Sequence, residues 1–223
     1  MSLQSLRCSY PVTFGVAVAA CVVAANAALP VWDNAAQNDL AHTGAAAVLV
    51  AVLYVVSGGS SLPASLGKGI WQRRWPAVTA VVVFALVAYA AVVCIAGFVA
   101  GARTAVLSPS YLGLLALSCV ATGVFEEGLF RGFLFEGFAQ ATGESLPVGS
   151  AWKAAVATSV LFALLHVLQG NPASAFFPDA VWVVFKLVEA TAFGLAMCYL
   201  RLRGFSVWTL AALHAGFDFL YFL

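Results

Sequence analysis

The chain has 223 residues, of which 63% are hydrophobic and only 9% charged, with a mean hydropathy of +1.00. Soluble domains carry about 25% charged residues, so this composition excludes a soluble domain built around a buried core. The net charge of +1 argues against nucleic acid as a partner. Several spans of about 20 residues would use most of the chain. We therefore expect an all-α, polytopic transmembrane helix bundle in a single membrane domain, residues 1–223.

Apolar runs that could cross a bilayer occur seven times along the chain. The first follows Arg7 and contains Ala25-Asn26-Ala27, which resembles a signal-peptidase site. Residues 1–27 could thus be a cleaved signal or the first span, and we favour an uncleaved span that acts as its own insertion signal. A polar loop is expected at Asp33–His42. The seven predicted spans cover residues 12–29, 43–56, 76–100, 110–138, 153–167, 180–200 and 205–223.

The basic residues orient these seven spans. With a cytoplasmic N-terminus, the opposite loops contain only Arg103. This asymmetry is what the positive-inside rule expects, and shifting the count by one helix removes it. The sequence predicts a multi-pass protein of the plasma or cell membrane, with its N-terminus inside and its C-terminus outside. The residues on the cytoplasmic side would be Arg7, Lys68, Arg73, Arg74, Lys153, Arg201 and Arg203.

The fourth run contains two acids and an arginine within sequence otherwise suited to lipid, from Val124 to Arg131. A charged side chain at bilayer depth costs at least about 2.5–3.5 kcal/mol on insertion scales, so three together require a reason. Glu127 and Arg131 are four residues apart on one helix face and can pair. Glu126 lies about 100° round the helix from Glu127. One acid therefore has a structural role, and Glu126 is available for chemistry.

Further polar residues stand in the later apolar runs. His166 follows Phe162 by four residues, and Asp218 follows His214 by four. Such residues are expected to converge inside the bundle because lipid does not solvate them. Lys186 and Glu189, three apart, are expected to pair with each other, whereas Glu136 is expected only to mark the interface.

The polar set suits hydrolysis, with a glutamate taking a proton from water and a histidine stabilising an oxyanion. Glu126, His166 and His214 could instead hold a divalent metal such as zinc, because two histidines and a carboxylate leave a coordination position open. The HExxH motif is absent, and no spacing requires a metal. The serine motif GxSxG is absent too.

Three motifs in order, Glu126-Glu127-x-x-x-Arg131, Phe162-x-x-x-His166 and His214-x-x-x-Asp218, resemble those of the CPBP family. These are the CAAX-protease and bacteriocin-processing intramembrane endopeptidases, also called Abi. The resemblance covers residues 110–223, the expected catalytic core, and residues 1–109 carry no diagnostic motif.

The resemblance implies a role for each motif residue. Glu126 and His166 would activate a water. His214 and residue 218 would stabilise the oxyanion, and Glu127 with Arg131 would orient this oxyanion-stabilising group. Position 218 is Asp218 in this chain, whereas the resemblance to CAAX-processing members implies an Asn at this position. It could orient His214 as an ionised carboxylate or donate to the oxyanion when protonated, and the orienting role is favoured.

The leading hypothesis is an intramembrane endopeptidase that cleaves a peptide or membrane-protein substrate within or beside the lipid bilayer. A proton-coupled transporter or channel could use the same intramembrane Glu, His and Asp residues. A third alternative is a non-catalytic immunity or binding protein. One geometric question accompanies the leading hypothesis: by helix rise, Glu126 lies nearer the cytoplasmic end of its helix and His166 nearer the opposite end, so tilted or overlong helices are needed to join them.

Overall fold

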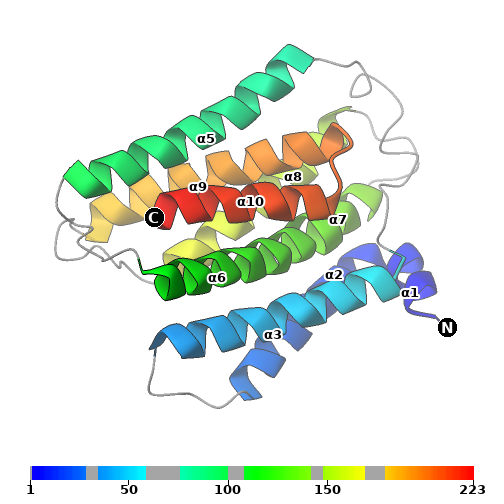
Figure 1. Cartoon of the computed structure of the whole chain (residues 1–223). Coiled ribbons are helices and arrows are strands. Elements are labelled where there is room, and N and C mark those ends of the chain that lie inside the picture. The colour runs from blue at the N-terminus through cyan, green and yellow to red at the C-terminus, as the bar shows by residue number, and fades with distance from the viewer. Residues whose placement is uncertain (1, 29–34, 59–75, 100–107, 142–147, 169–178) are drawn as a thin grey trace.

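The computed structural model describes residues 2–28, 35–58, 76–99, 108–141, 148–168 and 179–223, and every regular element in these ranges is a helix (Figure 1). The first four are α1 (Leu3–Ser9), α2 (Pro11–Ala28), α3 (Ala35–Val56) and α5 (Pro76–Val99). A long helix follows, formed by α6 (Pro109–Glu127), the π-helical η2 (Gly128–Leu134) and α7 (Phe135–Ala141). The chain closes with α8 (Val148–Leu168), α9 (Asp179–Leu202) and α10 (Val207–Phe222).

Seven apolar helical segments follow the order of the seven predicted runs. Four are long and apolar enough to cross a membrane, namely Pro76–Ala96, Pro109–Ala139, Ala151–Leu168 and Asp179–Leu202. Three shorter ones are Val12–Val22, Leu40–Val56 and Val207–Phe222. The prediction of a multi-pass, all-α membrane bundle is confirmed.

Two local predictions need correction. The helix α3 begins at Ala35, so most of the polar segment Asp33–His42 is helical where a loop was expected. The segment holds good helix formers and no Pro or Gly, and its polarity does not prevent helix formation. The short helix α1 was not predicted either; Ser2 caps it by accepting a hydrogen bond from the Ser5 amide at 3.1 Å. The Lys68–Arg74 segment and Arg103, which entered the charge asymmetry, lie outside the described residues.

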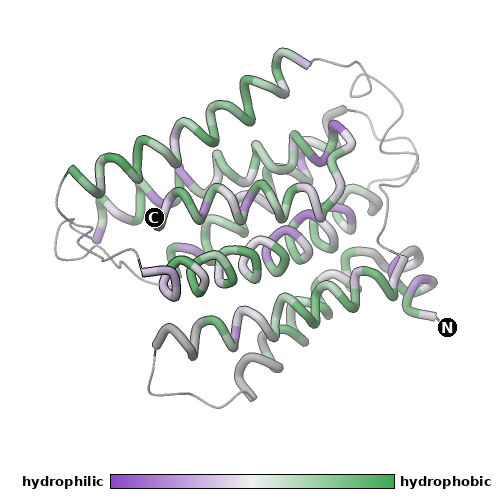
Figure 2. The backbone as a smooth tube through the Cα atoms, in the orientation of Figure 1, coloured by the Kyte–Doolittle hydropathy of each residue, from purple (hydrophilic) through white to green (hydrophobic). Residues whose placement is uncertain are grey.

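The long helix α6–η2–α7 runs through the molecule, with α2 and α3 on one side and α8, α9 and α10 on the other (Figure 1). The core that joins them includes Val50 and Tyr54 of α3, Phe133 of η2, Phe162 of α8 and Leu210 of α10. Helix α5 packs mainly on α10 and is apolar almost throughout (Figure 2). It exposes large side chains such as Phe84, at 73%, as expected of a helix that faces lipid.

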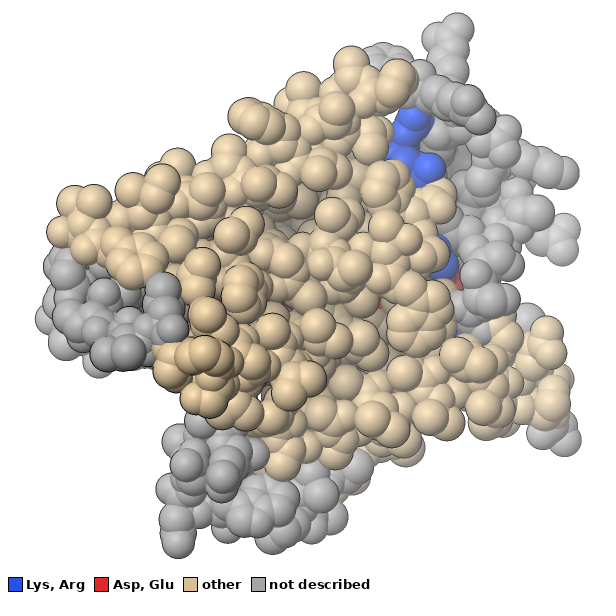
Figure 3. All heavy atoms as spheres, viewed as in Figure 1, with Lys and Arg blue, Asp and Glu red and all other residues tan. Residues whose placement is uncertain are grey.

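The turn between α9 and α10 reverses the chain. Gly204 adopts φ = 94°, a left-handed conformation that favours glycine. Ser206 then caps α10 by accepting a hydrogen bond from the Thr209 amide at 3.0 Å. On the face shown in Figure 3, the visible Lys and Arg side chains gather at the end of the molecule where this turn and the N-terminus lie.

Candidate active site

A close contact between α6 and α10 brings the first and third motifs together. A Cβ atom at Gly123 would lie only 2.4 Å from the carbonyl oxygen of Ala211, so the two backbones touch at this point. Glu126 and His214 each follow the contact by three residues, nearly one helical turn. The glycine thus allows an acid of one helix to face a histidine of the other.

Glu126 stands between the two motif histidines. Its Oε2 atom is 3.9 Å from Nε2 of His166 and 3.6 Å from Nε2 of His214. The same oxygen is buried and accepts no hydrogen bond from any described residue. The depth mismatch is resolved by an overlong helix, because α6–η2–α7 continues to Ala141 and leaves Glu126 near its middle.

Glu127 is fully buried and joins Arg131 to His214. Its Oε1 accepts from Nη1 of Arg131 at 3.0 Å and lies 2.8 Å from Nδ1 of His214. Arg131 also donates through Nη2 to the Gly194 carbonyl at 3.3 Å. The predicted Glu127–Arg131 pair is present. A carboxylate can only accept here, so Nδ1 of His214 carries a hydrogen and Nε2 faces Glu126.

The backbone of the second motif orients His166. Nδ1 lies 2.9 Å from the Phe162 carbonyl oxygen, which can only accept. In the neutral ring this leaves Nε2 as an acceptor directed at Glu126. The Phe162 ring supports the arrangement, with its centroid 4.3 Å from that of His166 and the Arg131 guanidinium 4.7 Å above it.

Asp218 lies on the Nε2 side of His214, at 3.6 Å, which is too long for a hydrogen bond. An orienting carboxylate would bind Nδ1 of His214, and this atom already contacts Glu127. The position that an orienting carboxylate would take at Nδ1 is occupied by Glu127, an acid from another helix, and not by Asp218. Sequence spacing suggested Asp218 because one helical turn separates it from His214, but spacing does not show which ring nitrogen it meets.

Predictions were also made for two groups of polar residues outside the three motifs. Lys186 and Glu189 pair at 2.9 Å as predicted, and Glu189 also accepts from the Tyr89 hydroxyl at 2.6 Å. Glu136, expected at the interface, is instead only 1% exposed and forms salt bridges with Arg7 and Arg201. That prediction is wrong because two arginines from distant helices converge on it, and the sequence gives no signal of their meeting.

Comparison with known families gives one match, to type II CAAX prenyl endopeptidase Rce1-like, over residues 107–220. The match covers just over half of the chain. The chain belongs to this Rce1-like family. Membership indicates CAAX-type intramembrane protease activity, with a peptide or protein as substrate. All six motif residues lie within the match: Glu126, Glu127, Arg131, His166, His214 and Asp218. Comparisons with curated proteins and with solved structures give no match.

The described residues of this Rce1-like chain contain no group of three His, Cys, Asp or Glu side chains arranged to hold a metal ion. The Nε2 atom of each histidine lies beside Glu126, and the contact between Nδ1 of His214 and Glu127 leaves Nε2 of that ring available.

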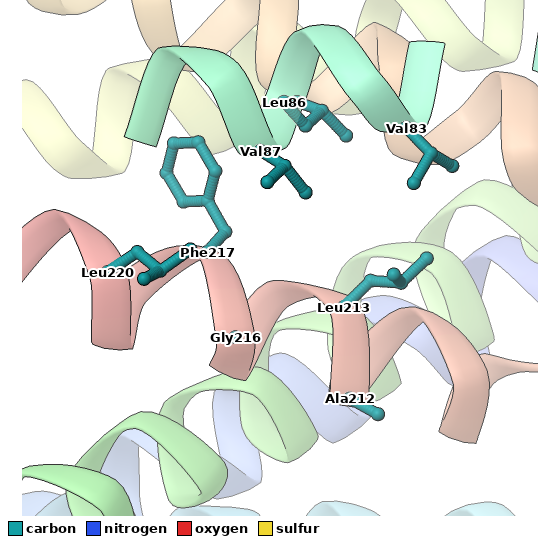
Figure 4. A pocket seen from close by; sticks show the side chains of 8 residues that line it. All are labelled: Val83, Leu86, Val87, Ala212, Leu213, Gly216, Phe217 and Leu220. Carbon is teal, nitrogen blue, oxygen red and sulfur yellow. The ribbon is translucent and has the colours of Figure 1, made fainter. Parts of the chain in front are cut away.

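An apolar pocket of about 160 Å³ lies between α5 and α10 (Figure 4). Leu213 and Phe217 of α10 form part of its wall, and both are sequence neighbours of the motif residues. The ring centroids of Phe217 and Phe193 are 4.7 Å apart, and those of Phe193 and His214 are 4.6 Å apart. The pocket is thus separated from the histidine by aromatic side chains.

Proposed function

We propose that this protein is an intramembrane endopeptidase that hydrolyses a peptide bond in a membrane-associated peptide or protein by glutamate-activated water. One observation carries the proposal. A buried, unpartnered oxygen of Glu126 lies between the Nε2 atoms of His166 and His214. A buried carboxylate oxygen without a donor is costly in an apolar bundle, and a reactant that donates to it would remove this cost.

The gap between Glu126 and His166 suits a water molecule. Two acceptors 3.9 Å apart can both lie within about 2.8 Å of one water oxygen. The water would donate one hydrogen to Glu126 and the other to Nε2 of His166. As the oxygen attacks the scissile carbonyl, Glu126 takes a proton, and it later delivers that proton to the leaving amine.

His214 would stabilise the oxyanion from the other side of Glu126. With both ring nitrogens protonated it donates through Nε2, while Nδ1–H stays bound to Glu127. Arg131 fixes Glu127 and thus the ring plane. Asp218, near the same Nε2, would add a donor when protonated. In this proposal Glu127 and Arg131 orient the His214 ring, and Asp218 contacts the oxyanion directly.

The family description favours a CAAX-type, prenylated substrate. We further propose that residues 110–223 are the catalytic core of a single membrane domain, residues 1–223. The protein would lie in the plasma or cell membrane, with the end that holds Arg7 and Arg201 in the cytoplasm. Both residues form salt bridges with Glu136 and so lie at the same end of the bundle, which supports assigning them to one side of the membrane.

The test is cleavage of a farnesylated peptide ending in a CAAX sequence by purified protein in detergent. Glu126→Gln should lower turnover by about 10²–10⁴-fold, the usual contribution of a general base, with an unchanged melting temperature. Glu127→Gln serves as the contrast, because it weakens the Arg131 pair and should lower both activity and melting temperature. Absence of cleavage by the wild type, with binding retained, would favour a non-catalytic protein.

A further inference from the structure

The long helix changes type at the point where it carries the site. Glu127 ends α6, and the next seven residues, Gly128–Leu134, form the π-helix η2 that contains Arg131. The amide of Phe135 bonds to the carbonyl of Phe130, five residues back. π-helical segments are rare in proteins, and those that occur are often found at functional sites. A wider turn packs less well than an α-helical one, so contacts from outside the helix are needed to hold it.

Those contacts come from the N-terminal helices. A Cβ atom at Gly128 would lie 2.4 Å from Cγ1 of Val50, and one at Gly132 would lie 2.6 Å from Cε2 of Tyr54. Two residues of α3, one turn apart, therefore press on η2 at its two glycines. On α2, a Cβ atom at Gly15 would lie 3.2 Å from the carbonyl oxygen of Phe133.

Arg7 of α1 holds the far end of the same segment. Its Nη2 donates to the Gly132 carbonyl at 3.1 Å and also pairs with Glu136, in the first turn of α7. Arg201 binds the other oxygen of Glu136 and donates to the Tyr54 hydroxyl at 3.2 Å. The exposed fraction of these four side chains is 9% or less. Separating either pair would leave a buried charge uncompensated, so these contacts favour one arrangement of the helices around η2.

A short series of contacts leads from η2 to the reacting groups. Arg131 on η2 binds Glu127, Glu127 binds Nδ1 of His214, and Nε2 of His214 faces Glu126. A change in the course of η2 would move Arg131 first and the His214 ring next. Displacements of about 1 Å in such a set are enough to slow a reaction strongly.

We propose that α1–α3 form a template that holds η2 in its π conformation, and that Arg7, Val50 and Tyr54 are positioning residues for hydrolysis. All three lie outside the family match at residues 107–220. The kinetic part of this proposal rests on the proposed function. Helices α1–α3 thus help to position the site, although they carry no motif.

Two substitutions that enlarge a side chain of η2 and shorten the facing side chain of α3 test the template. Gly128→Ala adds the methyl group that would meet Cγ1 of Val50, and Val50→Ala removes that carbon. Gly128→Ala should lower kcat by about tenfold or more with little change in KM. Val50→Ala alone should lower kcat by less than Gly128→Ala does, because it loosens the contact with η2 without pushing η2 away. The double variant should recover kcat to within about threefold of Val50→Ala.

The matched control is Gly44→Ala, also on α3, where an added Cβ atom meets nothing within 4 Å. Its kcat should equal that of the wild type. Should Gly128→Ala fail to fold, Arg7→Gln and Arg7→Lys replace it, since lysine keeps the charge opposite Glu136 and should retain more activity than glutamine. A folded Gly128→Ala variant with wild-type kcat would overturn the proposal, as would a double variant that shows no recovery.

Hydrogen exchange at the amides of residues 128–135, measured on the same samples, gives a result that does not depend on turnover. Gly128→Ala and Arg7→Gln should speed exchange in this segment, and the double variant should restore it. Unchanged exchange refutes the template even if the enzyme is active. If the double variant restores slow exchange but the wild type cleaves no peptide, the template is supported and the proposed function is refuted.

Discussion

Gly123→Ala is the sharpest test of how α6 and α10 build the site. An added Cβ atom would lie 2.4 Å from the Ala211 carbonyl oxygen, whereas ordinary van der Waals contact begins at 3.4 Å. The two backbones must therefore separate by about 1 Å, because neither partner is a side chain that can rotate away. Glu126 and His214 each lie three residues beyond the contact, so most of the displacement reaches the distance between them.

A 1 Å displacement of reacting groups can cost about 10²-fold in rate, or about 2.7 kcal/mol in activation free energy. We expect kcat of Gly123→Ala for the farnesylated CAAX peptide to fall by about this factor. The comparison is Gly113→Ala on the same helix, where a Cβ atom meets nothing within 4 Å and activity should be unchanged. Turnover of Gly123→Ala within about threefold of the wild type, at equal folded protein, would refute the reasoning.

Three other predictions follow from the same geometry. Arg131→Ala leaves Glu127 buried without its cation and should lower the free energy of unfolding by about 3–5 kcal/mol, seen as reduced folded yield and a lower melting temperature; a stable variant would show that the pair is dispensable. Asp218→Asn should keep activity to within about tenfold, since Glu127 orients the histidine and an amide can still donate to the oxyanion; a loss of about 10²-fold at pH 6–8 would return the orienting role to Asp218. Single cysteines placed within 68–74 and within 170–178, outside the described residues, should react with an impermeant reagent from opposite sides of the membrane; labelling of both from one side would overturn the orientation and the seven-span count.

The fold class and the motif order could be read from the sequence because both depend on local patterns. Seven apolar runs appear as seven apolar helical segments, since each run satisfies its own backbone hydrogen bonds in lipid. The Glu127–Arg131 and Lys186–Glu189 pairs were predictable for a similar reason, as residues three or four apart share a helix face.

Contacts between helices could not be read in this way. Glu136 looked like an interfacial acid, yet Arg7 and Arg201 reach it from helices 129 and 65 residues away along the chain. Nδ1 of His214 contacts Glu127, which lies 87 residues earlier in the chain on another helix. It does not contact Asp218, one turn away on the same helix as His214. No sequence spacing encodes such meetings, because they depend on how the helices cross.

The π conformation of η2 shows this division most clearly. The spacing of Glu126, Glu127 and Arg131 was enough to put all three on one apolar helix. Only the packing of the folded chain shows that this helix widens after Glu127, where α3 lies against Gly128 and Gly132. Hydrogen bonds between residues five apart are rare in isolated helices, and we attribute those of η2 to the close packing of α3 against its two glycines.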